Sequence, residues 1–389
     1  MISNRGIPPI SPTERHEIEN GVEPAEDGRE LNVLIVLPAA KVSEPRLAHY
    51  VQLPRARVLL VGDESRAPAF NLVRFRAWRV PFLGALGRWT GALSWYRGLK
   101  SFIPGPVDCV ISFEVFSLGS LQANQLAKRL GVPHIVTVAE VLTRSFFSVP
   151  PWRAVAAINR RSADAYVCSV ELARAHAIAQ GCPPERCVVM SPGVDLDLFT
   201  PNPQGRTREP VLLFIGEMRP DKGIREVMAA AERAHRHIPD LRLVIAGDGP
   251  LRHEVQEKAA RLGFIDYRGK IPRNELPDLY RSARCFILAP STRPFWAEQF
   301  GFASVEAMAA GLPVVITDSG AVRDVVPPWN PICPRKDVAA LSEGIIAALG
   351  PEGDAWGACN RETAERQYDD VKQAALLRDW LGAQVASRQ

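Results

Sequence analysis

The sequence predicts an α/β fold with two parallel sheets, one following the other along the chain. Short apolar segments alternate with longer helical segments, which is typical of parallel strands joined by crossover helices. The alternation stops at Ser191–Pro210, which is dense in Pro, Gly and Asp, and then begins again. We therefore expect two domains, and a length of 389 residues agrees with that number.

The first domain is expected at residues 31–190. It follows a polar stretch at residues 1–30, which is rich in Pro, Gly and Glu and is predicted to be disordered. Its buried strands are recognised as continuous apolar runs, and two helical segments lie between them. The expected strands are Leu31–Leu37, Val58–Val61, Val107–Phe113, His134–Val138, Asp164–Ser169 and Arg186–Met190, with helices at Leu118–Leu130 and Val170–Gln180.

The second domain is expected at residues 211–369, after a linker at residues 191–210. A small-residue helix at Ser304–Ala310 ends at Gly311, and Pro313 follows, which is a helix stop signal. The other expected elements are strands at Val211–Ile215, Leu241–Ala246, Phe264–Arg268, Cys285–Leu288 and Val314–Thr317, and helices at Gly223–His237 and Leu251–Leu262.

Composition restricts the class of protein. A net charge of +4 favours anionic ligands without indicating nucleic acid as a partner. The seven Cys include no C-x-x-C pair, so neither a zinc site nor a disulfide framework is indicated. No apolar run of about 18 residues exists, and the N-terminus does not resemble a signal peptide. We therefore expect a cytoplasmic protein.

Two carboxylates, Glu298 and Glu306, flank a break in the chain at Gly301. On one helix they would lie about 80° and ~12 Å apart, too far to hold one small group. With the break, Glu298 belongs to a loop and Glu306 to the first turns of a helix, whose free N–H groups can bind a phosphate. Carboxylates accept bonds from hydroxyls, so the pattern favours a sugar nucleotide. The alternative is two solvated acids at a helix start.

The segment Gly216–Gly223 follows a strand and opens a helix, which places it at the ligand-binding edge of a parallel sheet. Lys222 can neutralise a diphosphate as a point charge, and Arg219 can supply a guanidinium. The alternative is that both are solvated loop cations. No G-x-G-x-x-G follows the first strand, so a nicotinamide dinucleotide site is not expected.

The string EQFG…EAMAAGLPVV around these carboxylates resembles the retaining GT-B glycosyltransferases of the GT4-type family. The resemblance runs from about Val211 to Ala348 and more loosely back to Asn32. It implies a GT-B fold, in which two Rossmann-like domains face each other across a cleft. It also implies that residues 370–389, with a helix at Asp370–Ala386, return to the first domain.

The resemblance assigns roles to individual residues. It implies that Glu306 holds the ribose, that Glu298 holds sugar hydroxyls, and that Lys222 with Arg219 binds the diphosphate. Glu217 stands where the family has an Arg, so the share of Arg219 stays open. Glu140 stands near the position of a family His and is either an acceptor-side or sugar-side group or a solvated loop acid. The remaining nucleotide-binding residues that it implies are Gly216, Lys270, Ile271, Phe300, Gly301 and Phe302.

The expected function is transfer of a hexose-type sugar from a nucleoside diphosphate sugar, with UDP-sugar favoured, to a hydroxyl acceptor with retained anomeric configuration. The acceptor can be a small metabolite such as an aminoglycoside, a polysaccharide or a lipid. No cofactor and no metal are expected. The alternatives are a 2-epimerase or a non-catalytic sugar-nucleotide binder on the same fold, and a peripheral membrane interaction protein.

A basic and aromatic stretch, Phe70–Phe102, bears on the membrane alternative. Helices of this composition can lie on anionic membranes. The several glycines in the stretch weaken a long interfacial helix, so we favour a crossover helix packed on the sheet.

Overall fold

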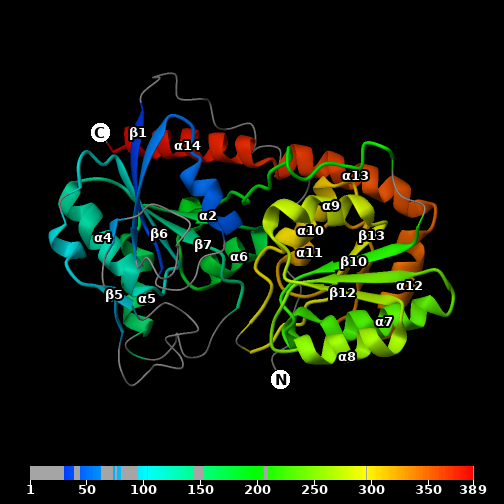
Figure 1. Ribbon diagram of the computed structural model, residues 1–389. Helices are drawn as coiled ribbons and strands as arrows, with labels where there is room; N and C mark the ends of the chain where they lie inside the picture. The colour runs from blue at the N-terminus through cyan, green and yellow to red at the C-terminus, as the bar shows by residue number, and fades with distance from the viewer. Residues whose placement is uncertain are drawn as a thin grey trace.

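The computed structural model describes residues 30–38, 44–62, 73–74, 77–79, 94–102, 104–142, 150, 152–205, 209–294 and 296–388. The chain forms two parallel sheets, and Figure 1 shows them beside each other, each with helices packed around it. The α/β architecture predicted from the alternating pattern is confirmed.

The first sheet has seven strands in the order β3-β2-β1-β6-β7-β8-β9, and every neighbouring pair is parallel. Its central strands are buried along their whole length, as expected for a parallel sheet with both faces covered. The strands are β1 Leu31–Val36, β2 Ala56–Gly62, β3 Val73–Arg74, β6 Cys109–Phe113, β7 His134–Val138, β8 Ala165–Cys168 and β9 Cys187–Val189.

Helices cover both faces of this sheet. Helix α4 (Leu118–Leu130) packs on the face of Leu34 and Val110, while α2 (Glu44–Val51) packs on the face of Ile35 and Ile111. Local signals bound α4, since the Ser117 hydroxyl accepts a bond from the Gly119 N–H and Gly131 ends the helix with φ 73. Helices α5 (Trp152–Ser162) and α6 (Glu171–Ala179) complete this half.

The second sheet has six parallel strands in the order β12-β11-β10-β13-β14-β15. The strands are β10 Val211–Ile215, β11 Arg242–Ala246, β12 Ile265–Gly269, β13 Cys285–Leu288, β14 Val314–Thr317 and β15 Ile332–Cys333. The helices are α7 Ile224–His235, α8 Arg252–Leu262, α9 Leu276–Ser282, α10 Phe302–Ala309, α11 Val322–Val325, α12 Val338–Leu349 and α13 Glu352–Gln367, with 3-10 turns η6 Pro220–Lys222 and η7 Arg273–Glu275. The 3-10 turn η5 (Pro184–Arg186) precedes β9 of the first sheet.

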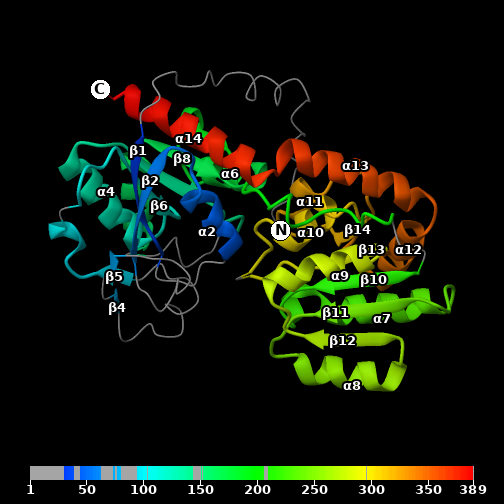
Figure 2. The same cartoon turned by 45° about the horizontal axis from the view of Figure 1, so that its top comes forward.

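The chain passes between the two sheets twice, at neighbouring points. The Val194 N–H donates to the Tyr368 carbonyl (2.7 Å), and the Asp370 N–H donates to the Val194 carbonyl (3.2 Å). After the second passage, α14 (Asp370–Ala386) lies on the first sheet, where Leu377 and Leu381 join its core. Figure 2 shows α13 and α14 following one another over the two sheets.

The prediction of a crossover helix over Phe70–Phe102 is wrong where the structure describes this stretch. The described residues form β3, the antiparallel pair β4 (Ala77–Arg79) and β5 (Ser94–Tyr96), and the 3-10 turn η3 (Leu99–Ser101). Trp78 and Trp95 are register partners in the backbone pairing of β4 and β5, and aromatic residues are enriched in strands. Residues 80–93 and the predicted tail at residues 1–29 lie outside the described part of the chain.

Among the described helices, none combines the length and the apolar character that crossing a membrane requires.

Candidate functional site

The C-terminal ends of β10, β11 and β12 meet in a tight arrangement of turns. The Gly216 N–H donates to the Ala246 carbonyl (3.0 Å), and the Gly247 N–H donates to the Gly269 carbonyl (2.7 Å). Gly247 has φ 137, and a Cβ there would lie 1.8 Å from the Gly216 carbonyl oxygen. The sequence needs glycine at this point because the backbones touch. Gly216 therefore lies at the C-terminal edge of the second sheet, where ligands bind in folds of this kind.

Lys222 is fixed at the same edge by the glycine that follows it. Gly223 adopts φ 72, and a Cβ there would lie 1.7 Å from the Ala289 carbonyl oxygen. The turn η6 thus packs against the chain that leaves β13, and Lys222 Nζ lies 2.6 Å from Glu298 Oε2. Both side chains are largely buried, with 21% and 12% exposed, so neither is a freely solvated loop charge.

Arg219 is already paired within its own turn. Its Nε donates to Asp221 Oδ1 (2.9 Å), a second nitrogen bonds to Asp221 Oδ2, and Nη1 lies 3.4 Å from Glu217 Oε2. Burial lowers the pKa of Arg219, but these two acids outweigh it and raise the pKa above its ordinary value. Glu217 stands where the resemblance places the family Arg, and it contacts Arg219, the residue that could replace that Arg.

The Trp296 ring lies against both cations. Its centroid is 5.0 Å from Lys222 Nζ and 5.8 Å from the Arg219 guanidinium carbon. These are cation–π distances, and such contacts add to the attraction that holds a cation in a partly buried site. Trp296 therefore helps to place Lys222 beside Glu298.

The break predicted at Gly301 is present. Gly301 has φ 81 and directly precedes α10, which begins at Phe302 rather than at Ser304. In the described part of the chain, no hydrogen-bond partner is found for the backbone N–H groups of Phe302 and Ala303. Phe300 and Phe302 contact each other edge to face, with ring centroids 4.8 Å apart. An anion could bind at this helix start.

Glu306 is buried and held by two donors from other elements. Its Oε1 accepts from Arg273 Nη1 (2.8 Å), and its Oε2 accepts from the Tyr280 hydroxyl (2.9 Å). Burial raises the pKa of Glu306, while the charge and hydrogen bond of Arg273 and the bond from Tyr280 oppose that rise. The alternative of two solvated acids at a helix start is therefore excluded for both Glu298 and Glu306.

The remaining predicted residues lie at two places. Exposed Lys270 and half-buried Ile271 follow β12 and lead directly into η7, which carries Arg273. Glu140 belongs to the other sheet, where it follows β7 and is only 4% exposed. Its Oε1 accepts bonds from the N–H groups of Val141 and Leu142 (3.2 and 3.0 Å), so it is not a solvated loop acid.

The structure therefore forms two clusters on the second sheet. In one, Trp296 lies against Lys222 and Arg219, and Lys222 pairs with Glu298. The other joins Glu306 to Arg273 and Tyr280. The sequence patterns do not indicate that Trp296, Arg273 and Tyr280 belong to these clusters. A basic residue directly after Lys270-Ile271-Pro272, at the same strand end, is a signal that could have indicated Arg273.

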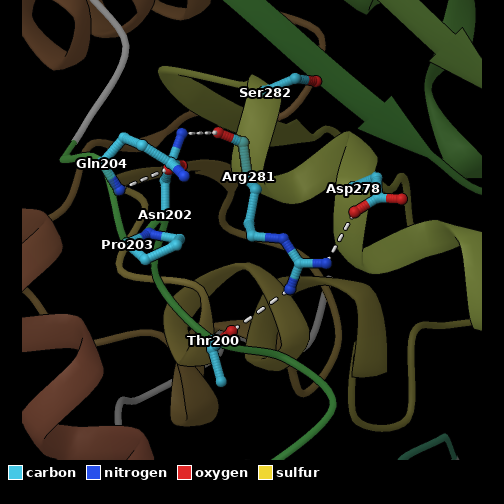
Figure 3. A pocket seen from close by; sticks show the side chains of 7 residues that line it. All are labelled: Thr200, Asn202, Pro203, Gln204, Asp278, Arg281 and Ser282. Carbon is cyan, nitrogen blue, oxygen red and sulfur yellow. Dashed lines mark hydrogen bonds and ion pairs between the residues drawn. The ribbon is translucent and has the colours of Figure 1, made fainter.

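A cavity of about 470 Å³ lies between the linker and α9 (Figure 3). Within it, the Arg281 guanidinium bridges Thr200 Oγ1 (3.2 Å) and Asp278 Oδ1 (2.6 Å). The cavity contains none of the predicted site residues. Its lining residues are Thr200, Asn202, Pro203, Gln204, Asp278, Arg281 and Ser282.

Two family models match the two halves of the chain. Residues 199–361 match the glycosyl transferases group 1 model, and residues 45–193 match the glycosyl transferase 4-like domain. The chain belongs to the GT4-type family of GT-B glycosyltransferases. The family resemblance inferred from the sequence is confirmed.

Curated relatives of this glycosyltransferase-family chain match over part of their length. It is 29% identical over 226 residues to the GDP-mannose-dependent alpha-(1-6)-phosphatidylinositol monomannoside mannosyltransferase of Mycolicibacterium smegmatis, covering 51% of this chain and 57% of that protein. It is 33% identical over 164 residues to the D-inositol 3-phosphate glycosyltransferase of Thermobispora bispora, covering 37% of each. The match to each thus spans less than two thirds of the relative's own length.

Solved structures of GT-B proteins match nearly the whole chain. Anabaena HepE in complex with UDP superposes with a TM-score of 0.72 at 16% identity, covering 91% of this chain and 100% of that one. Sucrose-phosphate synthase from Thermosynechococcus elongatus gives a TM-score of 0.65 at 18% identity, covering 92% and 100%. At these identities the likeness shows the fold alone, and that fold is GT-B.

Proposed function

We propose that this protein transfers a hexose-type sugar from a nucleoside diphosphate sugar to a hydroxyl acceptor, with retention of the anomeric configuration. One observation carries the proposal. Two carboxylates, the partly buried Glu298 and the buried Glu306, lie on either side of a helix start, and Lys222 is 2.6 Å from the first of them. A sugar nucleotide has hydroxyls at both ends and a diphosphate between them. The two carboxylates could accept bonds from the hydroxyls, and Lys222 with the N–H groups at the helix start could bind the diphosphate.

In the proposed mechanism, the leaving diphosphate is stabilised by Lys222 and by the amides at the start of α10. Such preorganised charges act most strongly where negative charge develops in the transition state. Glu298 holds sugar hydroxyls, and Glu306 holds the ribose. A phosphate oxygen of the leaving group takes the proton of the acceptor hydroxyl on the same face, so no separate base and no metal take part.

Arg219 receives a secondary role in this proposal. Its guanidinium is engaged by two acids, Asp221 and Glu217, whereas Lys222 pairs with Glu298, so we assign Lys222 as the main cation for the diphosphate. Phe300, Gly301 and Phe302 form the wall at the helix start. Further around the site, Gly216, Lys270 and Ile271 line the nucleotide end, and Glu140 contributes from the acceptor side.

Relatives support this class of donor and acceptor without identifying either. One curated relative is a GDP-mannose-dependent mannosyltransferase, and the matching HepE structure contains UDP. UDP-sugar is the donor that the sequence favours. The donor base is therefore best decided by direct comparison, and the acceptor is proposed only as a hydroxyl compound.

The test begins with a thermal-shift screen against UDP-, GDP-, ADP- and TDP-sugars. A ligand present at about 100 times its Kd adds about 2.7 kcal/mol of stability. The binding donor is then incubated with candidate acceptors, and products are analysed by mass spectrometry. A transferred sugar supports the proposal. Release of an epimerised sugar would contradict the proposal. Binding of the donor without any transferred or released sugar would also contradict it.

Two variants then test the assigned roles. Glu298→Gln should slow transfer strongly and leave binding of the free nucleoside diphosphate nearly unchanged, because this residue is assigned to the sugar. Glu306→Ala should weaken binding of the nucleotide, since a charged hydrogen bond to the ribose is worth about 1.5–3 kcal/mol. Glu257→Gln, an exposed acid on α8, is the matched control. Equal transfer by Glu298→Gln and this control would remove Glu298 from the sugar site.

A further inference from the structure

We propose that Arg273 is a positioning residue that keeps the Glu306 carboxylate ionised and directs its free acceptor sites toward the ribose diol. The inference rests on the proposed function and deepens it at the nucleotide end of the site. Arg273 Nη1 lies 2.8 Å from Glu306 Oε1, and the Tyr280 hydroxyl lies 2.9 Å from Oε2.

The hydrogen-bond count explains the direction of the carboxylate. An ionised carboxylate offers about four acceptor positions, two on each oxygen. Arg273 takes one on Oε1 and Tyr280 takes one on Oε2. Each oxygen therefore keeps one acceptor position, and the plane of the carboxylate is fixed. Two neighbouring hydroxyls, as on an unsubstituted ribose, supply one donor to each.

The charge balance explains why a cation is needed. Glu306 is only 5% exposed, and burying a carboxylate without a partner favours its protonated form. A protonated carboxyl loses acceptor capacity and would bind a diol less well. Burial raises the pKa of Glu306, and Arg273 is the charged group that opposes this. Burial and Glu306 itself raise the pKa of Tyr280, so its hydroxyl is a neutral donor.

Other elements packed against α10 do not provide a substitute. From α13, Arg361 Nη1 donates to the carbonyls of Ala309 (2.7 Å) and Phe199 (2.9 Å). The strands β13 and β14 beneath α10 have the sequences CFIL and VVIT and carry no charged residue. Among the described residues, only Arg273 of η7 and Tyr280 of α9 bring a charged or titratable group into contact with the Glu306 carboxylate.

The linker holds both donors in place. The guanidinium carbon of Arg273 lies 5.2 Å from the centroid of the Phe199 ring, and that ring contacts Tyr280 edge to face at 5.5 Å. Phe199 is fully buried. Arg273 is therefore stacked on one side and bonded on the other, which is the planar geometry that Arg provides and Lys does not.

The experiment measures binding of UDP and of GDP by calorimetry from about pH 5 to about pH 8.5. It compares wild type, Arg273→Gln, Arg273→Lys and Tyr280→Phe. Arg281→Gln is the matched control, because Arg281 is ion-paired to Asp278 on α9 and does not contact Glu306. The terminal phosphate of the probe also titrates in this range, so the result is the difference between each variant and wild type at each pH.

We expect Arg273→Gln to bind about 10- to 100-fold more weakly at the acidic end and to recover toward the alkaline end, where Glu306 ionises without help. Arg273→Lys should restore part of the affinity at acidic pH. Tyr280→Phe should weaken binding by a factor that varies less with pH, because it removes a neutral donor. The control should follow wild type.

Three outcomes decide the inference. If Arg273→Gln parallels wild type at every pH, Arg273 does not control the ionisation of Glu306 and the inference is wrong. If Arg273→Gln does not fold, the decision passes to Arg273→Lys, whose affinity must fall more at acidic than at alkaline pH. If wild type binds 2′-deoxy nucleotides as well as ribonucleotides, and Glu306→Gln changes nothing, the ribose assignment in the proposed function is wrong instead.

Discussion

At the residue scale, Glu298 and Glu306 are held in different ways. Glu298 shares a single contact with Lys222, and both side chains retain some exposure. Glu306 is held at both oxygens and is almost fully buried. A ligand can therefore separate the first pair by binding Lys222, whereas the second carboxylate stays fixed. This difference fits the proposed function. Negative charge would develop on the diphosphate near Lys222 during the reaction, whereas Glu306 would only bind the ribose.

The role of Lys222 can be tested by Lys222→Ala. Phosphate charge grows as the glycosidic bond breaks, so the loss should reduce turnover more than affinity. Removing such a group typically costs about 10²–10³ in rate. Turnover and nucleotide affinity should be measured together, with Lys258→Ala as the control, since the Lys258 side chain is comparably exposed and pairs with Glu232. Near-normal turnover would indicate Arg219 as the main phosphate ligand.

The sequence could indicate Lys222, Glu298 and Glu306 as candidate site residues but not the side chains that contact them. Lys222, Glu298 and Glu306 each stand in a local pattern, a strand-to-helix turn or a broken helix, and local patterns can be read from one sequence. Arg273 and Tyr280 reach Glu306 from 33 and 26 residues away. Such contacts depend on how the elements pack, and no spacing rule gives them.

At the scale of the elements, apolar runs predicted the strands well. The bounds of β7, β10, β13 and β14, and those of α4 and α14, agree with the prediction residue for residue. The stretch that became β3, β4 and β5 was misread because these strands have only two or three residues. These three strands contain no apolar run or alternation long enough to show a strand period.

Helix α2 offers a stability prediction through His49. This side chain is buried, and both ring nitrogens lack a hydrogen-bond partner among the described residues. Burial lowers the pKa of His49 from 6.5 to about 4. The unfolded chain therefore binds a proton below about pH 6.5 that the folded chain does not, and the stability falls as the pH decreases through this range. At pH 5 the cost is on the order of 2 kcal/mol.

We expect His49→Phe to stabilise the protein. Removing a buried, unsatisfied polar group contributes about 1–3 kcal/mol at neutral pH, and the gain should be larger near pH 5. Urea unfolding at the two pH values measures both quantities. His253→Phe on α8, where the side chain is exposed, is the control and should change neither. A gain that is equal at both pH values would show that His49 does not titrate on unfolding in this range.

At the scale of the whole molecule, described contacts between the two halves include the paired passages and a helix cap. The Asp324 carboxylate of α11 accepts from the Leu172 N–H at the start of α6 (2.8 Å). At the passages, Val194 and Asp369 form a bridge between the linker and the chain that enters α14. The residues that we propose for donor binding lie on one side of these contacts and Glu140 lies on the other. In the proposed function, the contacts therefore set the distance between donor and acceptor.

Gly193→Ala tests whether this arrangement matters for transfer. A Cβ at Gly193 would lie 2.2 Å from the Asp370 Cα and 2.5 Å from its nitrogen, so one of the two backbones has to move. Overpacking of this kind costs about 1–3 kcal/mol of stability. The residues assigned to the nucleotide follow the linker, at positions 216–306, so we expect nucleotide affinity to stay within about twofold while sugar transfer falls more steeply.

Calorimetry, transfer rates and urea unfolding of the same preparation separate these effects. Gly105→Ala is the control, because no atom lies within 4 Å of the added Cβ. A parallel loss of nucleotide affinity and transfer in Gly193→Ala would mean that the substitution disturbs the second domain itself. Unchanged transfer would mean that the passages tolerate a shift without altering how the two halves meet. Only a selective loss of transfer supports the view that the paired passages at Gly193 align donor and acceptor.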